Sequence, residues 1–111
     1  MSKVNIRSIL ENKTTKDIIE LKTKGIKNDN VITYKDNDVL VSIKIDNSIK
    51  MKRNNIEFIF IKNKNTNCIY NIYNKNLILN LFTNEIIISD KYIEIDYKIE
   101  DEKLNFKLFI E

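Results

Sequence analysis

The stretch that decides the fold of this chain is Tyr92-Ile93-Glu94-Ile95-Asp96-Tyr97-Lys98-Ile99. Apolar side chains recur at every second position from Ile93 onward, and mostly charged residues stand between them. Successive side chains of a β-strand point to opposite faces, so this pattern predicts a strand with one buried and one solvated face. Residues 104–110 nearly repeat it, as Leu-Asn-Phe-Lys-Leu-Phe-Ile.

The rest of the chain is a succession of similar short segments separated by Asn, Asp and Lys. We expect strands over residues 4–11, 17–24, 31–34, 39–45, 48–53, 56–62, 68–73, 77–83, 86–89, 92–99 and 104–111. Turns recur about every 8–12 residues, which is typical of an all-β sandwich or barrel. Connections this short join antiparallel neighbours, and 111 residues are enough for one domain spanning the whole chain.

Three turns are marked by their residues. Asp46-Asn47 and Asn54-Asn55 predict tight hairpins, because Asp and Asn tolerate a positive φ better than other non-glycine residues. Gly25 is the only glycine, and we expect it to end the strand over 17–24 with a positive φ.

The middle of the chain is apolar on both strand faces. Phe58 and Phe60 share a face while Ile59 and Ile61 make the opposite face apolar, and residues 77–82 and 86–88 show the same feature. Exposed apolar patches are limited in soluble monomers, so we expect a second sheet or a second copy of the chain to cover these strands. A homodimer is the interpretation we favour.

Composition argues against most catalytic and metal sites. The chain has no His and one Cys, so the usual general base and the usual tetrahedral zinc ligands are missing. We therefore expect no enzyme activity, no metal and no cofactor. The net charge of +3 is spread along the chain, which favours a solvated surface over a nucleic-acid footprint. Neither a signal peptide nor a membrane span is evident, and the lone Cys68 fits the cytoplasm.

A few residues remain as candidates for binding. Arg7 and Arg53 are the only arginines among 19 basic residues, and arginine offers a planar, bidentate donor to a carboxylate or phosphate. A structural ion pair across strands is the favoured alternative for both. Apolar rings from the interior would line the same site, two of them with hydroxyls: Phe58, Phe60, Tyr70 and Tyr97. Cys68, which is followed by the apolar residues Ile69 and Tyr70, is expected to be a buried, inert thiol.

The order of these segments resembles the YwiB-like family, a domain of unknown function among small bacterial calycin-type β-barrels. The resemblance rests on residues 19–25, 32–35, 51–55, 77–86 and 93–99. The run Leu77-x-Leu79-x-Leu81-x-Thr83, followed by Ile93-x-Ile95-x-Tyr97, is its most specific part. Asn55 stands where the family typically has Gly, and Tyr73-Asn74 replaces a Tyr-Gly turn. The resemblance implies an up-and-down antiparallel barrel of roughly eight to ten strands, similar to lipocalins, and implies no known activity.

Two functions follow from a barrel of this kind. The first is a non-catalytic cytoplasmic protein that binds a small apolar or amphipathic anionic ligand inside the barrel. A ligand there needs a cavity well above about 100 Å³. The alternative is a structural or interaction module that uses an apolar outer face for self-association or for a protein partner. We expect neither nucleic acid nor membrane as a partner.

Overall fold

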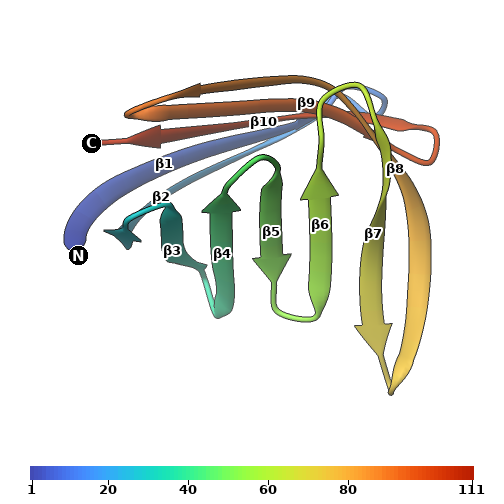
Figure 1. Cartoon of the computed structure of the whole chain (residues 1–111), viewed down its shortest axis with the longest axis horizontal. Coiled ribbons are helices and arrows are strands. Elements are labelled where there is room, and N and C mark those ends of the chain that lie inside the picture. Colours follow the sequence, from blue (N-terminus) through green and yellow to red (C-terminus); the bar gives the residue numbers. More distant parts are fainter.

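The computed structural model describes all residues, 1–111, and consists of ten β-strands without a helix. Figure 1 shows the strands following one another around a barrel. Their bounds are β1 Ser2–Asn12, β2 Asp17–Asn28, β3 Val31–Asp36, β4 Val39–Ile45, β5 Ile49–Arg53, β6 Ile56–Phe60, β7 Asn65–Ile72, β8 Lys75–Ser89, β9 Tyr92–Ile99 and β10 Glu102–Ile110. With no helix, the fold also lacks any helix long and apolar enough to cross a membrane.

Every strand pairs antiparallel with its sequence neighbours, and β1 closes the barrel by pairing with β10. The ends of the chain meet at this closure, where the backbones of Asn5 and Glu111 exchange two hydrogen bonds of 3.0 and 2.8 Å. The expected all-β, up-and-down antiparallel barrel is confirmed. Neighbouring strands pair antiparallel because each turn is too short for anything but a hairpin between them.

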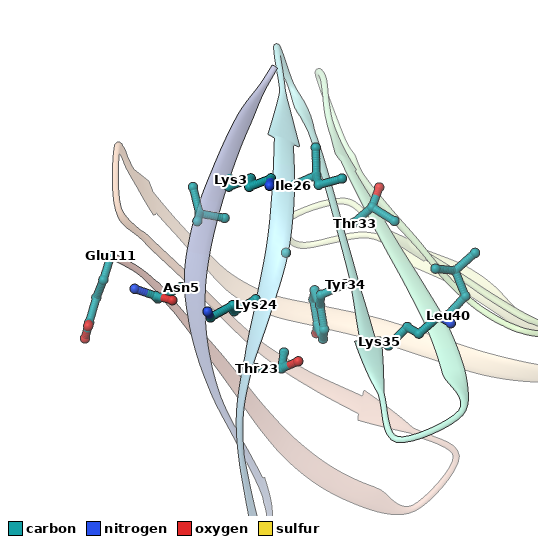
Figure 2. Close-up of a pocket in the computed structure, with 12 residues that line it drawn as sticks. Lys3, Asn5, Thr23, Lys24, Ile26, Thr33, Tyr34, Lys35, Leu40 and Glu111 are labelled. Atoms are coloured by element: carbon teal, nitrogen blue, oxygen red, sulfur yellow. The ribbon is translucent and has the colours of Figure 1, made fainter.

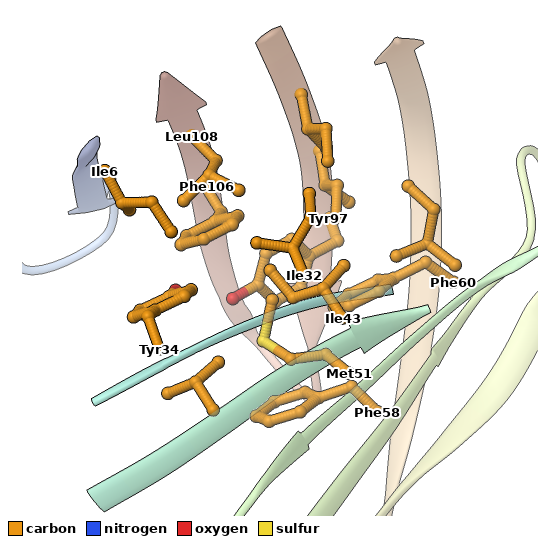
Figure 3. Close-up of a cluster of buried hydrophobic side chains, with 14 of the residues drawn as sticks. Ile6, Ile32, Tyr34, Ile43, Met51, Phe58, Phe60, Tyr97, Phe106 and Leu108 are labelled. Carbon is orange, nitrogen blue, oxygen red and sulfur yellow. The ribbon is translucent and has the colours of Figure 1, made fainter. Parts of the chain in front are cut away.

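The core fills the inside of the barrel. The alternation in β9 places Ile93, Ile95 and Tyr97 inward and buried, as the sequence pattern predicts. Seventeen buried apolar residues from nine of the strands form one cluster, part of which is drawn in Figure 3. In it, Phe60 stacks on Phe58 with ring centroids 5.8 Å apart and meets Tyr97 edge-on at 4.9 Å. Burial of such side chains contributes about 1.5–3 kcal/mol each.

Strand β8 joins two segments that the sequence pattern separates. Leu81 and Thr83 face inward, but the next inward residue is Ile86, because a bulge between Thr83 and Glu85 shifts the register. One extra residue reverses the facing of everything after it. The alternation therefore breaks at Asn84 although the strand continues. Similarly, β7 begins at Asn65, in a stretch expected to be a loop.

The conformation expected at Gly25 is wrong. Gly25 lies within β2 and its φ is not positive. A side chain there would place its Cβ 2.5 Å from Ile6 Cδ1 and 2.7 Å from the Thr33 carbonyl oxygen. Glycine is needed for close approach of the strands rather than for a turn. Positive φ values occur in hairpin turns instead, at Asn54, Tyr73 and Asn74 among others.

Several large apolar side chains remain exposed on the single chain. They include Ile61, Leu77, Ile78 and Ile87, from the stretches that are apolar on both faces. No second layer of the same chain covers them, because the outer face of a barrel wall is solvated. The homodimer inferred from these stretches stays a prediction.

Candidate functional site

The first candidate site lies at one end of the barrel, where the β3–β4, β5–β6 and β7–β8 turns gather at the lower edge of Figure 1. Arg53, the last residue of β5, donates a hydrogen bond of 2.9 Å to Asp36 at the end of β3. Both side chains are about one-quarter to one-third exposed. The ion pair holds the guanidinium across the ends of three neighbouring strands.

Tyrosine hydroxyls gather near this ion pair. Burial raises the pKa of Tyr34 and of Tyr97 far above the ordinary value, and the charge of Arg53 opposes that shift only in part. Figure 3 shows Tyr97 pointing its hydroxyl toward the side of the interior where Tyr34 lies. Burial also raises the pKa of Tyr70, and the charges of Cys68 and Glu102 add to the shift. These hydroxyls therefore stay protonated and can donate hydrogen bonds at neutral pH.

The interior beyond these groups is packed. Phe58 and Phe60, expected to line a ligand cavity, instead stack on one another within the core. The largest hollow on the molecule lies on the outer wall and contains neither ring. Thr83 faces the same interior, and its buried Oγ1 has no hydrogen-bond partner. The barrel thus resembles those filled by side chains rather than those with a roomy cavity.

Arg7 lies apart from this group, on the outer wall. Its guanidinium is 3.3 Å from the Glu20 carboxylate and stands over the Phe109 ring, 5.2 Å from the centroid. The neighbouring Ile6 and Ser8 face inward and are buried, so alternation turns Arg7 outward. The structure brings together five of the six predicted residues, Arg53, Tyr70, Tyr97, Phe58 and Phe60, and places Arg7 elsewhere.

Cys68 lies inside the barrel and is fully buried. Burial raises the pKa of its thiol to about 11, so the reactive thiolate is scarce at neutral pH. This fits the expected inert thiol.

The carboxylates of β9 form a polar network on the outer wall. Tyr92 donates a hydrogen bond of 2.5 Å to Glu94, and the Asn105 amide donates to both Glu94 and Asp96. The Tyr92 hydroxyl is the main reason that the pKa of Glu94 is lowered. Burial alone would raise the pKa of Asp96, but hydrogen bonds from Lys13 and Asn105 outweigh it and lower the pKa. No group of three or more Cys, Asp and Glu side chains is placed to hold a metal ion.

The second candidate site is a groove where β2 and β3 separate. These strands pair only from Gly25↔Tyr34 to Asn28↔Val31, and the next residues, Lys24 and Lys35, are not paired. Figure 2 shows Tyr34 in the opening between the two strands, with Lys24 and Lys35 beside it. The groove has a volume of about 870 Å³. It is lined by Lys3, Val4, Asn5, Thr23, Lys24, Gly25, Ile26, Thr33, Tyr34, Lys35, Leu40 and Glu111.

Positive charge dominates this groove. Lys3, Lys24 and Lys35 contribute three ammonium groups, none of which forms an ion pair, against the single carboxylate side chain of Glu111. Apolar surface lies beside them, because Ile26 and Leu40 are roughly half exposed on the outer wall. Sequence reasoning missed this site because lysine is common throughout the chain. The sequence signal that could have indicated the groove is Lys24 directly before Gly25, the only glycine.

The family model described as "Domain of unknown function (DUF1934)" matches residues 4–108. The chain belongs to this family. The DUF1934 match covers nearly the whole barrel, from β1 into β10, and confirms the resemblance inferred from the strand motifs. Nothing in the family's description names a ligand or a reaction.

A solved structure shares the fold of this DUF1934 barrel. The crystal structure of ywiB protein from Bacillus subtilis superposes with a TM-score of 0.73, covering 98% of this chain and 89% of that chain at 19% sequence identity. At that identity the likeness establishes the fold. No curated protein is similar enough to this DUF1934 chain to count as a match.

Proposed function

We propose that this DUF1934 barrel is a binding protein for a small amphipathic anion, held in the groove between β2 and β3. The observation that carries the proposal is three unpaired lysines around a groove of about 870 Å³ with apolar surface beside them. Known small-molecule sites span about 300–1,000 Å³, so the groove has the size of a ligand site.

Electrostatics favours an anionic head group between Lys24 and Lys35. If the β2–β3 ladder continued past Gly25 and Tyr34, these lysines would stand directly opposite one another. Like charges in that position destabilise a sheet. A carboxylate, sulfonate or phosphate between them relieves the repulsion and gains charge-assisted hydrogen bonds.

The apolar part of the ligand would lie against Ile26 and Leu40. Both side chains are on the outer wall next to the lysines, Ile26 on β2 and Leu40 on β4. Each buried methylene contributes about 0.8 kcal/mol, roughly fourfold in affinity, so burial of three methylenes would raise the affinity about 50-fold.

Binding inside the barrel is the second location, at Arg53, Tyr70 and Tyr97. The convergence of the guanidinium with buried hydroxyls favours it. The packed rings of Phe58 and Phe60 count against it, since a ligand would have to displace them. We therefore place the ligand in the groove and retain a non-catalytic role in the cytoplasm, which the single buried Cys68 supports.

The test is titration with 8-anilinonaphthalene-1-sulfonate, an aromatic anion, followed by fluorescence and by amide chemical shifts. We expect saturable binding with the largest shifts at residues 23–26 and 33–35. The double variant Lys24→Gln/Lys35→Gln should weaken binding about tenfold, because two charge-assisted contacts are lost. Lys64→Gln/Lys75→Gln, which removes one lysine beside each end of β7 and none from the groove lining, is the matched control.

Two results would overturn the proposal. One is equal affinity in the groove variant and the control. The other is a set of shifts centred on Arg53, Tyr70 and Tyr97, with affinity lost in Arg53→Gln, which would move the ligand into the barrel.

A further inference from the structure

The first half of β2 is a free sheet edge. Its pairing with β1 runs from Asp17 to Lys27, whereas its pairing with β3 covers only Gly25 to Asn28. Residues 17–24 therefore lack a neighbour on one side, and no turn or loop hydrogen bond reaches them. Figure 1 shows β2 running along β1 away from the row of strands β3–β6. At about 3.3 Å per residue, this edge is roughly 26 Å long.

An edge of this length usually attracts another strand. Its alternate N–H and C=O groups point outward without partners, which is a template for strand addition. Two isoleucines on it are strongly exposed, Ile18 by 65% and Ile19 by 62%. Ile19 belongs to the inward row of β2, because its partner Leu10 packs on the core, yet no strand lies beyond it to cover it.

We propose that two copies of the chain associate by pairing their β2 edges antiparallel, with Leu21 opposite its own copy. A twofold axis perpendicular to the sheet places each residue opposite one on the same face. With the axis at Leu21, Ile19 stands opposite Thr23 of the second copy, and Glu20 stands opposite Lys22. The second copy would extend the sheet as β1–β2–β2–β1.

Charge selects this register. The axis at Leu21 forms two Glu20–Lys22 pairs across the interface, and opposite charges in that position stabilise an antiparallel pair. Moving the axis to Glu20 sets the two Glu20 side chains against each other. Moving it to Ile19 sets Asp17 opposite Leu21. Lysines on an edge discourage unselective pairing, and only the first of these registers compensates Lys22.

Side-chain size also suits the pairing. The inward row of the combined edge brings Ile19, Leu21 and Thr23 together from each copy, and Ile19 adjoins the partly buried Leu10 of β1 at the core. The pairing uses only residues 19–23, so it stops before Gly25, where β3 occupies the edge. The groove lysine Lys24 stays outside the ladder.

Charge reversal with sedimentation equilibrium tests the interface. Glu20→Lys and Lys22→Glu each turn two attractive pairs into repulsive ones, so each variant should weaken dimerisation about tenfold or more. An equimolar mixture of the two variants restores both pairs, as does the double variant, and both should dimerise as the wild type does. Ile78→Lys, on a similarly exposed isoleucine of β8, is the control and should leave dimerisation unchanged.

Cysteine cross-linking tests the register. Leu21→Cys should form an intermolecular disulfide on mild oxidation, because opposite Cα atoms lie about 4.5–5.5 Å apart. Ile19→Cys alone should not, since its two copies are four residues out of register, about 14 Å apart. A mixture of Ile19→Cys and Thr23→Cys should cross-link. The native Cys68 is buried and does not compete.

Three results would overturn the inference. If the wild-type chain stays monomeric at a concentration 100-fold above the lowest that the assay detects, self-association through any surface is rejected. Loss of the dimer in Ile78→Lys but not in Lys22→Glu moves the interface to the apolar outer face of β8. Cross-linking of Ile19→Cys rather than Leu21→Cys rejects the register. None of these results depends on whether the groove binds an anion.

Discussion

Leu108 and Leu21 are on the same row of the barrel wall, and their surroundings differ sharply. Leu108 on β10 pairs with Ser8 of β1 and Ile93 of β9, and it is fully buried. Leu21 on β2 pairs with the same Ser8 but has no neighbour on its other side, and it is only partly buried. Leucine thus contributes to a fully paired wall on one side of Ser8. On the other side it lies at the incompletely paired boundary between β2 and β3, which we call the seam. The number of strands flanking a position, more than its residue type, decides its burial.

The largest expected effect comes from truncating these two leucines. Leu108→Ala should lower the free energy of unfolding by about 2–5 kcal/mol, because it leaves a cavity in the sealed wall. Leu21→Ala should cost less than about 1.5 kcal/mol, because solvent already reaches that position. Chemical denaturation at the lowest workable protein concentration measures both, so that self-association does not add to the cost at Leu21. Equal losses would contradict the distinction between wall and seam.

Gly25→Ala should have the next largest effect, since it acts on the seam itself. The added methyl group meets Ile6 Cδ1 at 2.5 Å and the Thr33 carbonyl oxygen at 2.7 Å, so β2 and β3 must move apart. We expect the free energy of unfolding to fall by about 1–3 kcal/mol. Amide hydrogen exchange should become faster at residues 31–34 of β3 and at their partners, residues 25–28 of β2. Ser42→Ala, on the outer face of β4, is the control. Unchanged exchange at the seam in Gly25→Ala would show that the strands are not held at contact distance.

Alkaline pH should destabilise the sealed interior. Burial raises the pKa of Cys68 from 9.0 to about 11 and raises the pKa of Tyr34 and Tyr97 above the ordinary 10.0. The folded state holds these protons longer than the unfolded state, so stability is complete below pH 9 and falls as the pH rises above it. The melting temperature should drop by about 5 °C or more between pH 9 and 11. The Cys68→Ser variant removes the contribution of the thiol. If its melting temperature stays constant up to pH 11, that result would contradict the burial of the tyrosines.

Thr83→Val should produce the smallest effect, and one of opposite sign. The Thr83 hydroxyl is fully buried without a hydrogen-bond partner, whereas valine has nearly the same shape and no polar group. We expect a gain of up to about 1 kcal/mol, measured by denaturation with Thr66→Val as the control. The Thr66 hydroxyl donates a hydrogen bond to the Ile59 carbonyl, so its loss should destabilise. A destabilised Thr83→Val would mean that the hydroxyl has a partner such as a buried water molecule.

Local patterns predicted most of the strands and their facing. Alternation alone predicts that Ile93, Ile95 and Tyr97 face inward, and this holds because β9 has a partner on both sides. The pattern failed at Asn84 and Gly25, where the deciding contacts come from residues far away in the chain. A bulge is specified by the partner strand as well as by its own residues, and the approach of Gly25 to Ile6 and Thr33 involves three strands.

The candidate binding residues divide in the same way. Alternation predicts inward positions for Phe58, Phe60 and Tyr97, and Tyr70 is a candidate for its hydroxyl; the structure gathers all four. Arg7 and Arg53 are both candidates as the only arginines, but residue type does not indicate which strand face a residue occupies, and only Arg53 lies with this group. The groove of Lys3, Lys24 and Lys35 was not predicted, because it exists only where two strands stop pairing.

The sequence by itself determined an all-β chain, its antiparallel order and the inward rows, because alternation and short turns are local properties of the chain. The tertiary structure decided which parts of the wall are sealed and which stay open. Barrel closure needs a tilt and a register that no single strand encodes, and here it leaves β2 with only four pairs to β3, from Gly25↔Tyr34 to Asn28↔Val31. The groove and the free edge both follow from that incomplete pairing.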